Sequence, residues 1–451
     1  MADLQEYHSQ LRNRVHCPHC WHKFPPQDAL WISQHPDLLG DPRLGSDHQL
    51  RFLPSRFTTA GAAVDSRGFA CFGLACPRCH LSVPRSLFEM EPVFFSILGA
   101  PSCGKSYFLA SMVWSLRKTL PKHFLLSFGD SDPYLNQQLN DYEEQQFLNP
   151  NQDDLVALRK TEVQGDLYDT VLYGDQAVRY PRPFIFSLNP LDQHPSSANR
   201  QKLSRALCMY DNAGESFLPG ADSGSSPVTR HLVHSRALLF LFDPTQDLRF
   251  RRACQGKTND PQMANRASRL TREVAVRQDT ILLESAQRIR QFAGLAQSAK
   301  HKRPLIVIVT KHDSWSGLSN TTIDQPPWVE GRGMSLCGLN TFAIEELSSK
   351  IRSVLWELTP EIVAAAESFS DHVIYIPVSA MGRAPEVDPA TGAFGIRPRD
   401  IRPQWTEVPL LYYLARWQPG IVPCVTADYH SKAQTTPSRP SPPRRSLPQR
   451  D

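Results

Sequence analysis

The feature that most constrains the fold is a loop between a short apolar run and an amphipathic segment. The run is VFFSIL (93–98), the loop reads GAPSCGKS, and YFLASMVWSLRKTL follows. This Gly-x-x-x-x-Gly-Lys-Ser pattern binds phosphate when it lies between a buried strand and a helix, through inward backbone N–H groups, a lysine and a Mg²⁺-binding serine. The residues expected to bind phosphate and Mg²⁺ are Gly99, Ala100, Pro101, Ser102, Cys103, Gly104, Lys105 and Ser106.

Several apolar runs are predicted to be strands of one sheet. Continuous apolar runs of this length are typical of strands covered on both faces, as in a mainly parallel sheet packed between helices. Residues 261–298 carry apolar side chains at helical spacing and are predicted to include a packing helix. The sequence therefore predicts an α/β fold of the P-loop type. The predicted strands are 93–98, 183–188, 206–211, 237–243, 304–310 and 372–379.

A second motif lies at the end of the strand predicted at 206–211. It reads Asp211-Asn-Ala-Gly214-Glu215. A carboxylate at a strand tip can hold Mg²⁺ through water, and a glycine N–H can contact a γ-phosphate. The motif is common by itself, and its position after a buried strand and downstream of the phosphate loop is what gives it weight.

A third motif bears on which nucleotide base is bound. It reads Thr310-Lys311-His312-Asp313 and lies at the end of the strand predicted at 304–310. An ionised aspartate accepts two hydrogen bonds, which matches N1–H and the exocyclic amine of guanine. Adenine has no donor at N1, and the mismatch would cost about 1.5–3 kcal/mol per charged hydrogen bond. Lys311 is expected to lie along the base. The turn at Ser379-Ala380 is expected to point N–H groups toward the guanine O6, so the motifs predict guanine.

This ordered set of motifs resembles the GTPases of the translation-factor-related class over about residues 91–418. The resemblance implies GTP and Mg²⁺ as ligands. It implies that Lys105 and Asp211 support hydrolysis and that Glu215 occupies the position of the residue that orients the attacking water. The implied γ-phosphate contact is Gly214, and the implied base contacts are Lys311, Asp313, Ser379 and Ala380.

The chain departs from a minimal GTPase domain in the long segments between its motifs, which imply insertions. The threonine that closes over Mg²⁺ is expected within 121–180, where Thr161 and Thr170 both qualify and Thr161 is preferred. Glu215 replaces a commoner glutamine or histidine and could act as a base or repel the γ-phosphate. The elaborated form is similar to the bacterial double-GTPase group of conflict and defence systems, which implies a switch acting with protein partners.

The first 90 residues contain two Cys-x-x-Cys pairs, Cys17 with Cys20 and Cys76 with Cys79. Two such pairs can complete a tetrahedral Zn²⁺ site of the zinc-ribbon kind. Residues 21–75 between the pairs must then form an inserted loop or subdomain. Redox activity is the alternative, but it requires a pair at a helix start, which neither pair has. The further candidate ligands are His16, His19, His22, Cys71 and His80.

Charge and composition limit the choice of partner and location. The formal net charge is +4, and residues 430–451 alone carry five cationic residues and one acidic residue, which leaves the remainder near neutral. Nucleic acid is therefore an unlikely partner, although a local basic patch would escape this count. The first residues lack the apolar core of a signal peptide, and no run is long enough to span a bilayer. The expected location is the cytoplasm.

These observations predict three regions: a zinc-ribbon-like module at 1–90, a P-loop GTPase domain at 91–420, and a disordered Pro- and Arg-rich tail at 421–451. The favoured hypothesis is a GTP-hydrolysing molecular switch. One alternative is a nucleotide-binding scaffold with little or no turnover. The other is a P-loop ATPase in which the Thr-Lys-His-Asp motif is accidental.

Overall fold

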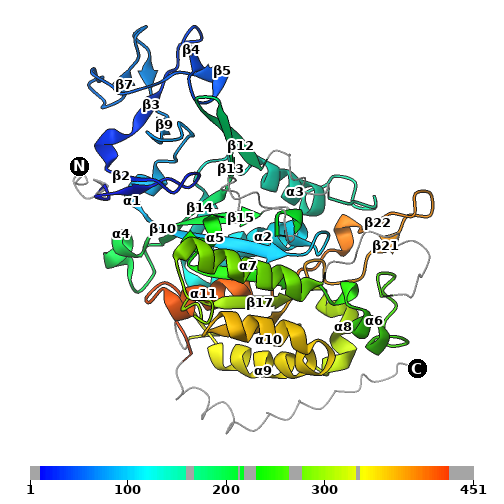
Figure 1. The fold of residues 1–451 in the computed structure, drawn as a ribbon. Helices are drawn as coiled ribbons and strands as arrows, with labels where there is room; N and C mark the ends of the chain where they lie inside the picture. Colours follow the sequence, from blue (N-terminus) through cyan, green and yellow to red (C-terminus); the bar gives the residue numbers. More distant parts are fainter. Residues whose placement is uncertain are drawn as a thin grey trace, which may run out of the picture.

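The computed structural model describes residues 11–158, 167–211, 214–217, 230–263, 277–331 and 336–425 (Figure 1). Most of the predicted tail lies outside these residues. The packed part of the chain continues past residue 420, because Ile421 and Val422 are buried and Cys424 forms a bridge to Leu339.

A seven-stranded, mainly parallel sheet forms the centre of the protein, in the order β11-β14-β15-β10-β16-β17-β20. Strand β10 is parallel to β15 and β16, and the pairs β16–β17 and β17–β20 are also parallel. Strand β14 is antiparallel to both of its neighbours. The α/β prediction and all six predicted strands are confirmed, whereas β11 was not predicted. The strands are β10 (Glu91–Gly99), β11 (Leu126–Asp130), β14 (Phe184–Pro190), β15 (Arg205–Asp211), β16 (Ala237–Phe242), β17 (Leu305–Val309) and β20 (Val373–Pro377).

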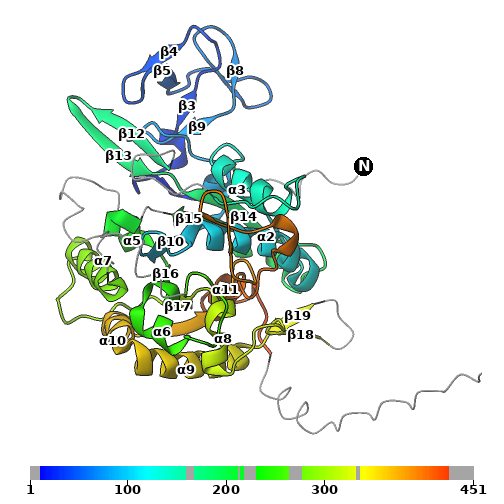
Figure 2. The same cartoon turned by 90° about the vertical axis from the view of Figure 1, so that its right-hand side faces the viewer.

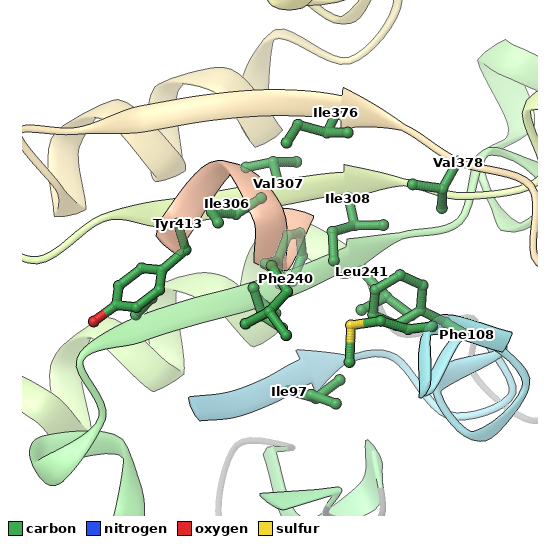
Figure 3. Packing of buried hydrophobic residues seen from close by; sticks show 14 of the residues in the cluster. Ile97, Phe108, Phe240, Leu241, Ile306, Val307, Ile308, Ile376, Val378 and Tyr413 are labelled. Atoms are coloured by element: carbon green, nitrogen blue, oxygen red, sulfur yellow. The ribbon is translucent and has the colours of Figure 1, made fainter. Parts of the chain in front are cut away.

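Helices cover this sheet and close its core. The predicted packing helix in 261–298 is present as α7 (Gln278–Ala293), and residues 264–276 lie outside the described part of the chain. Figure 3 shows side chains of β16, β17 and β20 packing together with Ile97, Phe108 and Tyr413. The other helices are α1 (Ser86–Glu89), α2 (Lys105–Phe124), α3 (Gln137–Phe147), α4 (Arg200–Leu203), α5 (His231–His234), α6 (Leu248–Ala253), α8 (His312–Ser319), α9 (Thr341–Leu358), α10 (Pro360–Phe369) and α11 (Val408–Trp417).

The segment between the two cysteine pairs folds as a small β subdomain, visible at the top of Figure 2. Strand β3 lies between β6 and β9, and two short hairpins, β4–β5 and β7–β8, complete it. Strands β1 and β2 form the hairpin that carries the first pair. The strands are β1 (Val15–His16), β2 (Lys23–Phe24), β3 (Leu30–Ile32), β4 (Leu39–Asp41), β5 (Gly45–Gln49), β6 (Arg51–Phe52), β7 (Ala63–Val64), β8 (Ala70–Cys71) and β9 (Leu74–Ala75).

The N-terminal module packs directly on one face of the central sheet. Successive strand residues point to opposite faces. In β10, Phe95 contacts Tyr413 of α11, and Phe94 belongs to a buried cluster with residues of the module. Trp21 donates a hydrogen bond from Nε1 to the Tyr210 hydroxyl at 3.2 Å. The module therefore shares a core with the sheet.

Three further hairpins extend from the domain. The hairpin of β12 (Tyr168–Tyr173) and β13 (Gln176–Pro181) reaches the module, where Leu172 N–H donates to the Arg43 carbonyl at 2.7 Å (Figure 2). The others are β18 (Trp328–Glu330) with β19 (Cys337–Leu339) and β21 (Glu386–Val387) with β22 (Phe394–Gly395). Of the helices that the structure describes, none has the combined length and apolar character of a membrane span.

Candidate functional site

The phosphate loop connects the end of β10 to the start of α2. Gly99 has φ +157°, and a Cβ there would lie 2.7 Å from Cys103 Sγ and 3.0 Å from the Leu241 carbonyl oxygen. Only glycine fits this close approach. Gly104 is the N-cap of α2, a helix of 20 residues. The first N–H groups of a helix have no partner within it, so the loop presents donors and a favourable dipole to an anion.

Lys105 is held inside this loop. Its Nζ donates to the carbonyl oxygens of Gly99 at 3.2 Å and Ala100 at 3.1 Å, and the residue is 7% exposed. A buried ammonium group at the N-terminus of a helix is suited to a strongly anionic ligand.

Asp211 lies beside the loop, at the carboxyl end of β15. Its Oδ2 accepts a hydrogen bond from Ser106 Oγ at 3.1 Å. Its Oδ1 is buried and has no hydrogen-bond partner among the described residues. Burial raises the pKa of Asp211, against the opposing effects of Lys105 and Ser106. An unsatisfied carboxylate oxygen next to a serine hydroxyl fits Mg²⁺, which prefers hard oxygen ligands and retains water.

Gly214 brings the second motif onto the phosphate loop. A Cβ at this position would lie 2.4 Å from Pro101 N and 2.7 Å from the Ala100 carbonyl carbon. A glycine is therefore required for the two backbones to touch. Gly214 begins the 3-10 helix η4 (Gly214–Phe217), which also contains Glu215. The backbone contact explains why the motif has glycine at its fourth position.

The structure does not test which threonine closes over Mg²⁺ or whether Glu215 orients the attacking water. Thr161 lies outside the described residues, as does the side chain of Glu215. Thr170 is an exposed residue of β12, opposite Arg179 of β13, in the hairpin that contacts the N-terminal module.

The predicted base motif lies at the carboxyl end of β17. Lys311 has φ +55°, and its Nζ donates to Asp243 Oδ2 at 2.7 Å and to Thr245 Oγ1 at 2.9 Å. Asp243 is fully buried and follows β16 directly. Sequence reasoning missed its role, although an aspartate at the end of an apolar strand was the available signal. Asp243 fixes the position of the lysine that is expected to lie along a base.

Asp313 and Ser379 meet across two strand ends. Asp313 Oδ1 accepts a hydrogen bond from Ser379 Oγ, and Ser379 Oγ accepts one from the Gly382 N–H at 2.7 Å. Burial raises the pKa of Asp313, whereas the bond from Ser379 lowers it and the nearby Asp260 raises it further. The predicted base carboxylate is thus oriented by the serine that sequence analysis assigned to the same pocket.

Part of the phosphate loop and the two predicted base motifs line one cavity of about 160 Å³. Cys103 and Gly104 line it from the phosphate loop, and the Thr310–Asp313 and Ser379–Ala380 segments line it from the sheet. Segments about 280 residues apart in sequence therefore meet at the carboxyl edge of the parallel strands, as ligand sites in such sheets do.

Part of this cavity was missed by sequence reasoning. The β21–β22 hairpin contributes Phe394 and Gly395, and Ile396 follows it and pairs with Val156. Tyr107 also lines the cavity, and its hydroxyl accepts a hydrogen bond from the Leu158 N–H at 2.7 Å. These contacts join distant segments with no motif of their own, so the sequence held no signal for them.

The four cysteines of the two predicted pairs form a closed cluster. The Sγ atoms of Cys17 and Cys79 are 3.7 Å apart, as are those of Cys20 and Cys76, and all four sulfurs lie within 4.8 Å of one another. A disulfide requires about 2.05 Å. A tetrahedron with Zn–S bonds of about 2.3 Å has edges of about 3.8 Å. The cluster therefore fits Zn²⁺ and leaves no open position for catalysis.

The two halves of the cluster repeat the same backbone geometry. Cys17 N–H donates to the His22 carbonyl at 2.9 Å, and Cys76 N–H donates to the Leu81 carbonyl at 3.0 Å. The His19 N–H donates to Cys17 Sγ at 3.4 Å, and in the second half the Arg78 N–H donates to Cys76 Sγ at the same distance. Three of the five further candidates contact other groups: His19 the Ser82 carbonyl, His80 the Asp41 carboxylate, and Cys71 the Asp65 carboxylate.

Comparisons with known proteins show only distant similarity. No protein-family model and no curated protein matches the sequence. Among solved structures, Era in complex with MgGDPNP and part of 16S ribosomal RNA is 12% identical with a TM-score of 0.21, covering 65% of this chain and 53% of that one. The GTP-bound Ski7 GTPase-like domain of S. cerevisiae is 13% identical with a TM-score of 0.25, covering 72% and 50%.

The chain thus spans about half the length of each of these structures. Similarity at this level carries no argument about function. The α/β fold with its mainly parallel sheet, and the four-cysteine cluster, are properties of this protein's own structure.

Proposed function

We propose that this protein binds GTP with Mg²⁺, hydrolyses it, and acts as a molecular switch. The observation that carries this proposal is the cavity at the carboxyl edge of the sheet, where the phosphate loop meets the Asp313–Ser379 pair. A P-loop by itself supports any nucleoside triphosphate. A largely buried carboxylate in the lining of the same cavity supports guanine.

Guanine preference follows from the hydrogen-bonding capacity of Asp313. Its side chain is largely buried and accepts hydrogen bonds from the hydroxyl groups of Ser379 and Ser314. A guanine base offers two N–H donors to such a carboxylate. Adenine would place an acceptor against it, which leaves a desolvated charge without a partner.

Each residue near the phosphates has a proposed task in hydrolysis. Lys105 would exchange its loop carbonyls for the β- and γ-phosphates, and Ser106 with Asp211 would hold Mg²⁺. The ion would neutralise charge that develops on the phosphates. Gly214, which contacts the loop backbone, would report the presence of the γ-phosphate. Glu215 would orient the attacking water, and Thr161 would close over Mg²⁺.

We further propose that the switch works in the cytoplasm with protein partners. The resemblance to the bacterial double-GTPase group motivates this part of the proposal. The proposed division is a zinc module at 1–90, a GTPase domain at 91–420 and a flexible tail after it. Zinc would stabilise the module in its position on the sheet.

The first test is a titration with fluorescent GTP and ATP analogues in the presence of Mg²⁺. Guanine-selective binding that is lost in Lys105→Ala is expected. A preference for ATP would refute guanine recognition, and only nucleotide binding by the P-loop would remain of the proposal. Asp313→Asn should weaken GTP and favour xanthosine triphosphate, because the amide can donate to the xanthine O2.

Turnover is tested separately by phosphate release. Glu215→Ala should slow hydrolysis while nucleotide affinity stays close to that of the wild type. Hydrolysis that is slow in the wild type and unaffected by this substitution would indicate a nucleotide-binding scaffold.

A further inference from the structure

A second cavity lies at the opposite edge of the sheet from the nucleotide site. It has a volume of about 330 Å³ and is lined by the first residues of β10 and by Arg236 and Arg303, which precede β16 and β17. These three strands are parallel, so their starts meet at one edge. The β1–β2 hairpin of the N-terminal module lines the cavity with His16 and Lys23. It lies where the module joins the sheet.

The lining of this cavity is strongly cationic. Five of its side chains are arginine or lysine, and its single carboxylate is Glu91, which pairs with Arg12. The five cationic residues are Arg12, Arg14, Lys23, Arg236 and Arg303. The whole chain has a formal net charge of only +4, so this cavity concentrates positive charge that the composition does not reveal.

Three of these cations lack a partner. The side chains of Arg14, Lys23 and Arg236 form no hydrogen bond or ion pair within the described part of the chain. Among the described residues, Arg303 donates to two backbone carbonyls, those of Val233 and Ser235. Side chains of like charge repel one another when they converge without counterions. Arg14, Lys23 and Arg236 are exposed to solvent, so their charges are available to an anionic ligand that enters the cavity.

The titration behaviour of the cavity agrees with this charge. Burial lowers the pKa of Arg303, and the neighbouring Arg236 lowers it further. Burial also lowers the pKa of His234 to about 4, with contributions from Arg303 and Lys23. Burial is the largest cause of both pKa shifts, and the neighbouring cations add to it in the same direction.

A neighbouring cavity extends the site. It measures about 370 Å³ and shares Glu91, Pro92, Arg236 and Arg303 with the first. It adds Lys302 and the aromatic rings of Tyr413 and Trp417. Each volume is within the range of small-molecule pockets, and the shared arginines place cations along both. A compact ligand with several anionic groups fits this arrangement better than a macromolecule spread over a surface.

We propose that these joined cavities bind a small molecule carrying two or more phosphate groups, at a site separate from the nucleotide site. Arginine guanidinium groups suit phosphate because they offer two parallel donors. The aromatic rings supply an apolar wall for the remainder of the ligand. This proposal does not depend on which nucleotide occupies the phosphate loop.

The test is calorimetric titration of inorganic tripolyphosphate into the full-length Lys105→Ala protein, in which the phosphate loop is disabled. The variant Arg14→Gln with Arg236→Gln, in the same background, should bind at least about tenfold more weakly, since each lost charged hydrogen bond is worth about that factor. Both arginines are exposed and unpaired, so the fold should persist. The matched control is Arg179→Gln, an exposed arginine of β13 that lies outside both cavities.

Three results would overturn the proposal. The first is equal tripolyphosphate affinity in the double variant and the Arg179→Gln control. The second is binding to the wild type that vanishes with Lys105→Ala, because the phosphate loop would then account for it. The third is Arg236-dependent binding of a single-stranded oligonucleotide without any binding of tripolyphosphate, which would assign the cavity to nucleic acid instead.

Discussion

Removal of zinc from the four-cysteine cluster is expected to unfold more than the module that contains it. The perturbation is Cys76→Ser, which removes one of the four buried cysteines that are proposed to bind zinc. The matched control is Cys71→Ser, the same substitution at a buried cysteine of the same module whose sulfur contacts Asp65 and not the cluster.

The expected magnitude comes from two sources. Structural zinc contributes an apparent free energy of about 10–16 kcal/mol in small zinc-binding peptides, which equals or exceeds the net stability of a typical domain, about 5–15 kcal/mol. The module also buries side chains of the sheet, among them Phe94, Ile185 and Tyr210. Exposing one phenylalanine and one isoleucine costs about 3–6 kcal/mol together. The sheet is therefore expected to lose stability when the module unfolds.

The assay combines zinc quantification with thermal unfolding. The wild type and Cys71→Ser should carry one zinc ion per chain and unfold in one transition. Cys76→Ser should lose zinc and lower Tm by about 10 °C or more, since several kcal/mol correspond to a shift of that size. A zinc chelator added to the wild type should reproduce this shift.

Two results would refute this reasoning. One is a folded wild-type protein purified without zinc. The other is a Cys76→Ser protein that lacks zinc and keeps the Tm of Cys71→Ser, because the module would then hold its place on the sheet by packing alone.

Three further predictions concern the nucleotide site. Gly214→Ala should lower the free energy of unfolding by about 1–3 kcal/mol, because its Cβ would lie 2.4 Å from Pro101 N; an unchanged urea midpoint would show that the two backbones separate freely. GTP affinity should be highest at neutral pH and fall in mild acid as Asp313 takes up a proton. Because burial raises the pKa of Asp313, this loss of affinity should begin at a higher pH than for an ordinary aspartate. Binding that does not change with pH would exclude the Asp313 carboxylate from base recognition. Ser106→Ala should abolish the Mg²⁺ dependence of GTP binding, measured with and without the ion, and a preserved dependence would place Mg²⁺ elsewhere.

Local sequence patterns determined the elements of this fold. The six predicted strands are long apolar runs, and such runs are stable only as buried strands of a covered sheet. The loop from Gly99 to Ser106 has the glycine spacing that its backbone conformation requires. The cysteine pairs likewise showed their chemistry by spacing alone.

Strand β11 escaped prediction for a physical reason. Residues 126–130 read LSFGD, a short segment that contains a glycine and ends in an aspartate. As the edge strand of the sheet, β11 pairs with β14 alone among the described strands. Pairing between distant strands leaves no periodic signal in so short a segment. The β21–β22 hairpin at the candidate site was missed because each of its strands has only two residues, which is too short to show a period.

The sequence by itself determined the candidate groups: a loop with the phosphate-binding pattern, an aspartate whose carboxylate would suit guanine, and four cysteines that could bind zinc. Only the tertiary structure decided which groups meet. It placed Asp243 against Lys311 and Ser379 against Asp313. It also gathered Arg14, Arg236 and other cations into one cavity of a nearly neutral chain. Such meetings depend on strand order and long-range packing, which composition and local periodicity do not encode.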